Sequence, residues 1–153
     1  MDYIASSQTR ESEMPYKEKI AWLSLLAMAV TFGPYFTFAA LSPPGDALPN
    51  FRQLGLYAAA TIVQIIILGA GHLYLRFKSP DDARAPADER DRAITQRSTT
   101  SAYNLLIAGM ILVGCIMPFL SSGWAIVNAA IFMIVVAEVV RHSLVVVSYR
   151  RQA

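Results

Sequence analysis

The chain has 153 residues and a formal net charge of +2, and 55% of its residues are hydrophobic while only 16% are charged. Soluble domains carry about 25% charged residues, and a domain this short exposes too much surface to enclose several helices that are apolar on every side. The composition therefore excludes an ordinary soluble domain and indicates an integral membrane protein.

The first 18 residues are polar and contain several acids, so we expect a tail and not a cleavable signal peptide. An uncharged run begins at Ile20, and we expect the first span at about residues 19–42. That length crosses a hydrocarbon core of ~30 Å at ~1.5 Å per helical residue. A turn cluster rich in Pro and Gly follows at residues 42–46.

Two further uncharged runs supply the other spans. The run between Arg52 and Arg76 predicts a span at about residues 53–77. The run between Arg97 and Glu138 would be about 60 Å long as one helix, roughly twice the core, so it must fold back. Pro118 and residues 121–123 supply the break. We therefore expect spans at about 99–120 and 124–149, and an all-α integral membrane four-helix bundle made of two helical hairpins.

The connection over residues 78–98 changes character at Asp88. Its first part is rich in Pro and Asp and is expected to be irregular. Asp88 suits a helix N-cap, and the acids after it suit the positive first turn. We expect one continuous helix from about 88 to 120, whose first ~15 Å lies in the cytoplasm or at the lipid head groups. The charges on this extension are a candidate docking surface for a protein partner: Asp88, Glu89, Arg90, Asp91 and Arg92.

The basic residues predict the orientation in the membrane. The chain has 13 Lys and Arg residues, and Arg52 alone falls between the first and second spans, while none falls between the third and fourth. Short loops rich in Lys and Arg stay in the cytoplasm. We therefore expect a multi-pass membrane protein with both termini cytoplasmic, residues 150–153 forming a short C-terminal tail. Acids lie among the bases in each basic segment, which argues against nucleic-acid binding.

Several segments resemble a known family. Residues 88–94, Asp-Glu-Arg-Asp-Arg-Ala-Ile, followed by a span containing Ser and Tyr, resemble small four-span bacterial membrane proteins of unknown function. Residues 16–22, 137–141 and 149–151 are similar to the entry, last span and exit of that family. The resemblance covers nearly the whole chain and implies four spans in a bacterial inner membrane. It implies no activity.

Polar residues inside spans are costly and usually face the bundle interior, so they are the default functional candidates. Measured by helical rise, Gln64 lies near the middle of its span and Glu138 lies about 3 Å from the middle of its own. Other polar residues, Ser24 among them, fall about 7 to 10 Å toward the cytoplasm. This coincidence predicts a polar layer in the inner half of the bundle. The candidate intramembrane polar cluster is Glu138, Arg141, His142, His72, Gln64 and Asn104.

Glu138, Arg141 and His142 occur at i, i+3 and i+4, which places them on one helix face. One interpretation is an Arg–Glu pair that pins the fourth helix, with the histidines satisfied by hydrogen bonds. Alternatives are a proton or ion relay, a metal site made with His72, and catalysis. The spacing matches no dedicated metal motif, and no catalytic set or cofactor-binding motif is recognisable, so we expect no cofactor.

Glycines in the second and third spans predict close helix approach: Gly69, Gly71, Gly109 and Gly114. The favoured function is a non-enzymatic interaction, regulatory or accessory protein that acts through its cytoplasmic face. The alternative is a small proton- or ion-coupled transporter or channel subunit, which would have to be oligomeric because four spans are thin for a conduit. The expected partners are the lipid bilayer and either another protein or a second copy of the chain.

Overall fold

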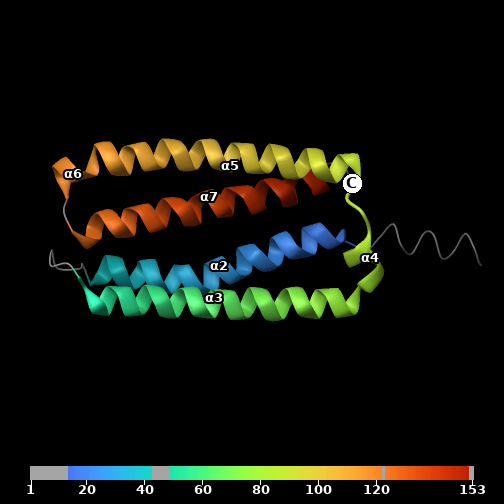
Figure 1. Cartoon of the computed structure of the whole chain (residues 1–153), viewed down its shortest axis with the longest axis horizontal. Coiled ribbons are helices and arrows are strands. Elements are labelled where there is room, and N and C mark those ends of the chain that lie inside the picture. The colour runs from blue at the N-terminus through green and yellow to red at the C-terminus, as the bar shows by residue number, and fades with distance from the viewer. Residues whose placement is uncertain (1–13, 43–48, 122, 152–153) are drawn as a thin grey trace, which may run out of the picture.

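The computed structural model describes residues 14–42, 49–121 and 123–151, and these segments are helical apart from short connections. Four helices are long and apolar enough to cross a membrane. They pack together as a bundle, which confirms the all-α fold expected from the sequence (Figure 1). In chain order the helices are α2 (Tyr16–Leu41), α3 (Phe51–Lys78), α4 (Pro80–Arg84), α5 (Glu89–Cys115), α6 (Met117–Leu120) and α7 (Trp124–Arg150).

The four long helices contact one another mainly in the order α3, α2, α7, α5. Helices α2 and α3 form one hairpin and α5 and α7 form the other, and the contact between α2 and α7 joins the two hairpins. The outer helices are therefore covered on one side only. In the most apolar stretch of α3 no residue is buried by the rest of the chain. Such a surface suits hydrocarbon, because a spanning helix satisfies its backbone hydrogen bonds internally and needs no polar face.

Each hairpin has one glycine at which its two helices approach so closely that a larger side chain would clash. A Cβ atom added to Gly71 on α3 would lie 2.4 Å from Cδ2 of Leu23 on α2. One added to Gly109 on α5 would lie 2.1 Å from Cε of Met133 on α7. The close approach expected at these two glycines is confirmed. At Gly69 and Gly114 the same added atom would meet nothing within 4 Å, so the expectation is wrong there.

The start of α5 agrees with the sequence, and its continuation is interrupted once. Asp88 is the N-cap, and its Oδ1 accepts a hydrogen bond of 2.6 Å from the backbone N–H of Asp91. The helix expected to continue to residue 120 extends from Glu89 to Leu120 as a candidate span, with one interruption at Ile116, between α5 and α6. Pro118 explains this interruption, because it has no N–H for the carbonyl four residues earlier and its ring clashes with that carbonyl.

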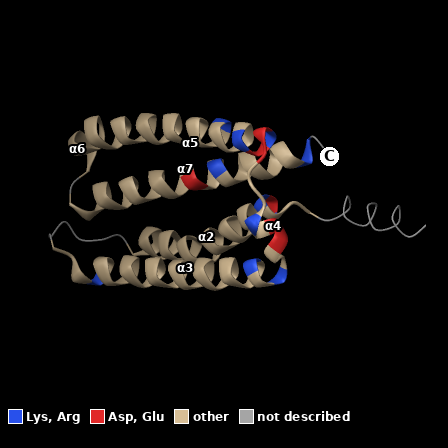
Figure 2. Ribbon diagram, turned by 45° about the vertical axis from the view of Figure 1, so that its right-hand side comes forward, with Lys and Arg blue, Asp and Glu red and all other residues tan. Residues whose placement is uncertain are grey.

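The connection before α5 also differs from expectation. Residues 80–84 form the short helix α4 where an irregular segment is predicted. Pro80 occupies the first turn, where a missing N–H carries no penalty, and Asp81 and Asp82 lie in the same turn. Figure 2 shows Lys, Arg, Asp and Glu concentrated at the end of the bundle where α2 and α5 begin and α3 and α7 end. We call this the charged end.

Candidate functional site

Asp91 joins three helices at the charged end. It lies in the first turn of α5, and its Oδ2 is 2.9 Å from Nζ of Lys17 on α2. Its Oδ1 accepts a hydrogen bond from the hydroxyl of Tyr149 on α7. One carboxylate thus binds both α2 and α7, which are not its neighbours in sequence.

A second ion pair lies beside the first. Nε of Arg150 on α7 donates a hydrogen bond of 3.1 Å to Oε1 of Glu18 on α2, and Glu18 is only 5% exposed. The guanidinium of Arg150 lies 5.3 Å from the centre of the Trp22 ring, within the range of cation–π attraction. Arg150 therefore gives the buried Glu18 carboxylate a charged hydrogen-bond partner from another helix.

Arg90 completes this set, because its guanidinium lies 5.7 Å from the centre of the Tyr149 ring. These contacts connect α2, α5 and α7 but include no residue of α3. The group consists of Lys17, Glu18, Trp22, Arg90, Asp91, Tyr149 and Arg150, and we call it the end cluster.

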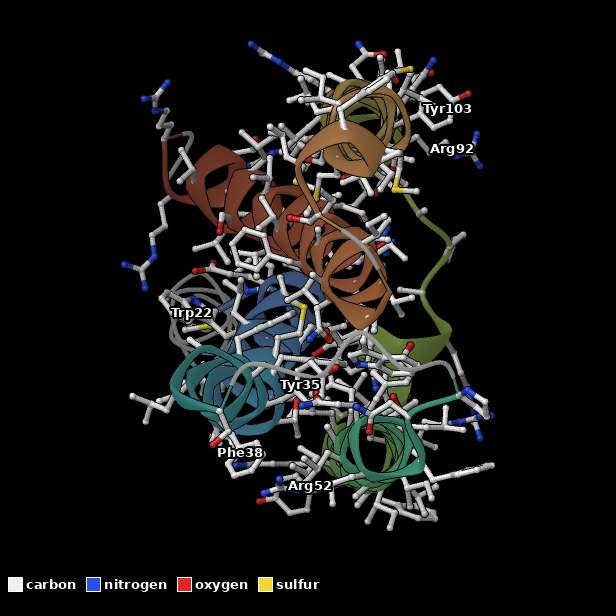
Figure 3. The ribbon with its side chains drawn as sticks, turned by 90° about the vertical axis from the view of Figure 1, so that its left-hand side faces the viewer. Trp22, Tyr35, Phe38, Arg52, Arg92 and Tyr103 are labelled. Atoms are coloured by element: carbon white, nitrogen blue, oxygen red, sulfur yellow. The ribbon has the colours of Figure 1, made fainter. Side chains whose placement is uncertain are left out.

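The predicted docking residues divide into two groups. Asp88 caps α5, and Arg90 and Asp91 belong to the end cluster, so these three act within the molecule. Glu89 and Arg92 are exposed and lie outside the end cluster. Figure 3 shows the Arg92 side chain pointing away from the bundle. Of the five predicted docking residues, α5 therefore offers only Glu89 and Arg92 to a partner without involving residues that act within the molecule.

Sequence reasoning missed the end-cluster residues of α2 and α7 as partners of the motif. A signal was present, since the segments that resemble the known family at 16–22, 88–94 and 149–151 each supply members of the end cluster. The most specific motif of the sequence is thus explained in part by contacts between helices.

Two clefts at the charged end share Lys17 and Asp91 among the residues that line them. The larger, of about 760 Å³, lies between the start of α2 and the segment around α4, and Tyr149 and Lys78 also line it. The smaller, of about 470 Å³, runs along α5. Acids and bases contribute to each, so neither cleft has a single sign of charge. The smaller cleft is lined by Lys17, Ala87, Asp91, Arg92, Thr95, Gln96, Thr99 and Thr100.

Along α7, Glu138, Arg141 and His142 come together as expected. Nη1 of Arg141 lies 3.1 Å and 3.2 Å from the two carboxylate oxygens of Glu138, and Nε2 of His142 lies 3.6 Å from Oε2. All three residues belong to the same helix. The pair therefore does not pin α7 to a neighbour, and this interpretation of the sequence lacks the contact between helices that it needs.

Among the residues that the structure describes, the other candidates of the predicted polar layer form no hydrogen bond or ion pair with this group. Gln64 Oε1 is 2.6 Å from the hydroxyl of Thr31, which links α3 to α2. Nδ1 of His72 lies 2.8 Å from the Leu68 carbonyl oxygen one turn earlier on its own helix, and the residue is exposed. Asn104 is exposed on α5. The structure thus brings three of the six candidates together.

Two polar contacts between spans were not predicted. Besides the contact of Thr31 with Gln64, the hydroxyl of Tyr35 on α2 donates a hydrogen bond of 2.6 Å to Oδ1 of Asn128 on α7. Figure 3 shows Tyr35 among the side chains between α2 and its neighbours. Both contacts involve α2, which lies inside the row of helices, so they hold its two neighbours against it.

The geometry for a metal site is missing from the part of the chain that the structure describes. Within residues 14–42, 49–121 and 123–151, no three His, Cys, Asp or Glu side chains are grouped so that they could hold a metal ion. The arrangement of His72, His142 and Glu138 considered from the sequence is therefore not assembled as a metal site.

Comparison with known proteins gives one family. The sequence pattern of a family described as "Predicted membrane protein (DUF2178)" matches residues 17–153. No curated protein and no solved structure matches the chain. The matched region begins at Lys17 and so contains the whole end cluster and all four long helices except for the first residue of α2.

Proposed function

Because the chain belongs to the DUF2178 family of predicted membrane proteins and has four apolar helices, we propose that it is a non-enzymatic interaction or accessory protein of the membrane. The observation that carries this proposal is the charged end. There, three helices are fixed by ion pairs and a polar surface with two clefts is held in place. A surface that is already ordered loses little conformational entropy when it binds a partner.

The charged end is proposed to lie in the cytoplasm, because Lys and Arg gather there and short basic segments stay on the cytoplasmic side. A bacterial inner membrane would then hold the protein with both termini inside. The test uses single cysteines at Ser79→Cys and Asp46→Cys after Cys115→Ser. A membrane-impermeant maleimide added to intact cells should label the second and not the first. Labelling at position 79 would reverse the orientation.

The docking surface on α5 is proposed to centre on Glu89 and Arg92. Both are exposed, one is acidic and the other basic, and they follow the N-cap on a helix that the end cluster fixes. Mixed charge suits a protein partner better than a lipid surface, because the acid would be repelled by anionic head groups.

A double charge reversal tests this surface. Glu89→Lys with Arg92→Glu keeps the net charge and leaves every residue of the end cluster in place. The protein is purified from native membranes with its associated proteins, which are quantified against the wild type. We expect the loss of a specific partner from this variant.

The matched control is Lys78→Glu with Asp82→Lys. It makes the same kind of reversal at the same end of the bundle, but on α3 and α4. The partner should be retained in this control. Retention in both variants, or loss from both, contradicts the assignment of docking to α5.

A second candidate function is coupling to protons or ions, and Glu138, Arg141 and His142, which we call the α7 group, favour it. Glu138 is one residue past the midpoint of α7 and contacts both Arg141 and His142. Ionisable residues at such a depth often belong to proton pathways.

Liposomes that contain Glu138→Gln protein should then lose a proton flux that wild-type liposomes support. The control Glu89→Gln makes the same chemical change outside the apolar part of the chain and should keep the flux. If liposomes that contain the wild-type protein show no proton flux, coupling to protons is contradicted as a function.

A further inference from the structure

The ion pair of α7 lies where a charge is least tolerated. The helix runs from Trp124 to Arg150, so its midpoint is residue 137 and about 20 Å of helix separates Glu138 from either end. In a spanning helix this position is near the centre of the hydrocarbon. The side chains of Glu138 and Arg141 are nevertheless 44% and 40% exposed. A single folded copy thus leaves this ion pair partly exposed near the middle of the membrane.

Apolar residues surround this pair on the same helix face. Ile134, Glu138, Arg141 and Val145 occur at i, i+4, i+7 and i+11, a spacing that aligns them along one side of α7. Ile134 is 49% exposed. Lipid chains can cover Ile134, but they offer neither a hydrogen bond nor an opposite charge to the pair. Glu138 and Arg141 already pair with each other, so a surface that adds apolar side chains and both signs of charge at this depth would cover the face better than lipid alone.

We propose that a second copy of this chain covers the face, with the two α7 helices parallel about a two-fold axis perpendicular to the membrane. In a two-fold interface, residue i of one copy meets residue j of the other, and j meets i. Glu138 of each copy then faces Arg141 of the other. The offset of three residues is about 4.5 Å along the helix, which the length of an Arg side chain spans.

Charge complementarity singles out a second copy as the occupant. The face carries one acid and one base, so it is complementary to itself. Two copies inserted in the same orientation place these charges at matching depths, whereas another protein would need both charges at the same spacing. The interface does not depend on the docking proposed at the charged end, because Arg141 lies nine residues, about 13 Å of helix, before Arg150.

Disulfide cross-linking of the full chain in native membranes tests the face directly. In a Cys115→Ser background, Ile134→Cys places a thiol one turn from Glu138 on the proposed interface. Val139→Cys is the matched control, because it lies next to Glu138 in sequence and depth but about 100° around the helix, and Val139 is also exposed at 36%. Upon oxidation, the first variant should form a covalent dimer and the second should stay single. Absence of the first dimer, or equal dimer from the control, overturns the proposal.

Charge complementation tests the pairing itself. Glu138→Arg gives a copy with two bases on the face, and Arg141→Glu gives a copy with two acids. Coexpressed with different tags, the two variants should co-purify nearly as well as two wild-type copies. Each variant should fail to co-purify with a second copy of itself. Failure of the mixed pair while both chains are inserted overturns the proposal. If neither charge variant inserts into the membrane, the cysteine variants still test the proposal, because they carry no change of charge. A cross-linked dimer at position 139 alone, or at neither position, would show that lipid or another protein covers the face.

Discussion

The end cluster and the α7 group contain similar residues and do different things. At the charged end, both ion pairs join different helices: Lys17 on α2 to Asp91 on α5, and Glu18 on α2 to Arg150 on α7. On α7, Glu138 pairs with residues of its own helix. A contact between helices stabilises tertiary structure, whereas a contact within one helix leaves the tertiary structure unchanged. The polar contacts of Glu138 thus stay within α7, which leaves Glu138 and Arg141 open to a role in transport or in self-association.

The largest effect is expected from Arg150→Gln, because it leaves the buried Glu18 carboxylate without its partner. Losing a hydrogen bond to a charged group costs about 1.5 to 3 kcal/mol, and the cation–π contact with Trp22 is lost as well. The free energy of unfolding in detergent should show this loss. Glu18→Gln with Arg150→Gln should recover part of it, since the double variant buries no unpaired charge. If Arg150→Gln and the wild type have the same free energy of unfolding, the end cluster does not stabilise the fold.

A smaller effect is expected from Asp91→Asn, which keeps the shape of the side chain but removes its charge. The ion pair with Lys17 is lost, and the hydrogen bond from Tyr149 loses its charged acceptor. Hydrogen bonds to charged groups contribute about 1.5 to 3 kcal/mol, so a loss near 2 kcal/mol is expected. Hydrogen exchange should also rise at the ends of α2, α5 and α7 and not in α3. Uniform exchange over all four helices would contradict a local role.

Gly109→Ala tests how much the α5–α7 hairpin depends on packing away from the end cluster. The added Cβ requires Met133 to move, which costs about 1 to 2 kcal/mol, partly offset by the ~1 kcal/mol by which Ala favours helix over Gly. Gly114→Ala on the same helix is the control, because its added Cβ meets nothing within 4 Å. Thermal unfolding should place the first variant below the wild type and the second at or above it.

The smallest effect on the fold is expected from Glu138→Gln. A pair at i, i+3 within a helix contributes about 0.2 to 0.5 kcal/mol, so dilute protein in detergent should unfold with nearly wild-type stability. The same variant should weaken self-association in membranes, measured by the yield of the dimer cross-linked at Ile134→Cys. A loss of stability as large as that of Asp91→Asn would show that the α7 group holds the fold after all.

The helices could be predicted because their causes lie in the local sequence. Uncharged runs of about 20 residues must cross the membrane, and Asp88 caps α5 whatever the tertiary structure is. The contacts among Glu138, Arg141 and His142 follow from helical spacing for the same reason. The short helix α4 and the interruption at Ile116 were missed, although Pro80 and Pro118 determine both.

The order of the helices and the end cluster could not be predicted in this way. In a membrane, surfaces that face lipid and surfaces that face protein are both apolar, so periodicity does not mark the interface between α2 and α7. Lys17, Asp91 and Tyr149 are ordinary residues for the ends of spans. No spacing rule connects them, because their proximity results from three separate helices ending at one level. Resemblance alone singled out their segments, and it gave no reason for their importance.

The hydrogen bond from Arg150 to Glu18 connects residues that are 132 positions apart in the chain. At translation rates of about 5 to 20 residues per second, Glu18 is made on the order of ten seconds before its partner exists. Each helical hairpin is local in sequence and can be completed as it is inserted, but the end cluster can form only after nearly all of the matched region has been synthesised. During that interval the Glu18 side chain lacks the hydrogen-bond partner that it has in the finished protein. Closure of the end cluster is therefore a late event in biogenesis, and a nascent chain arrested before Tyr149 should remain more accessible to membrane proteases than the finished protein.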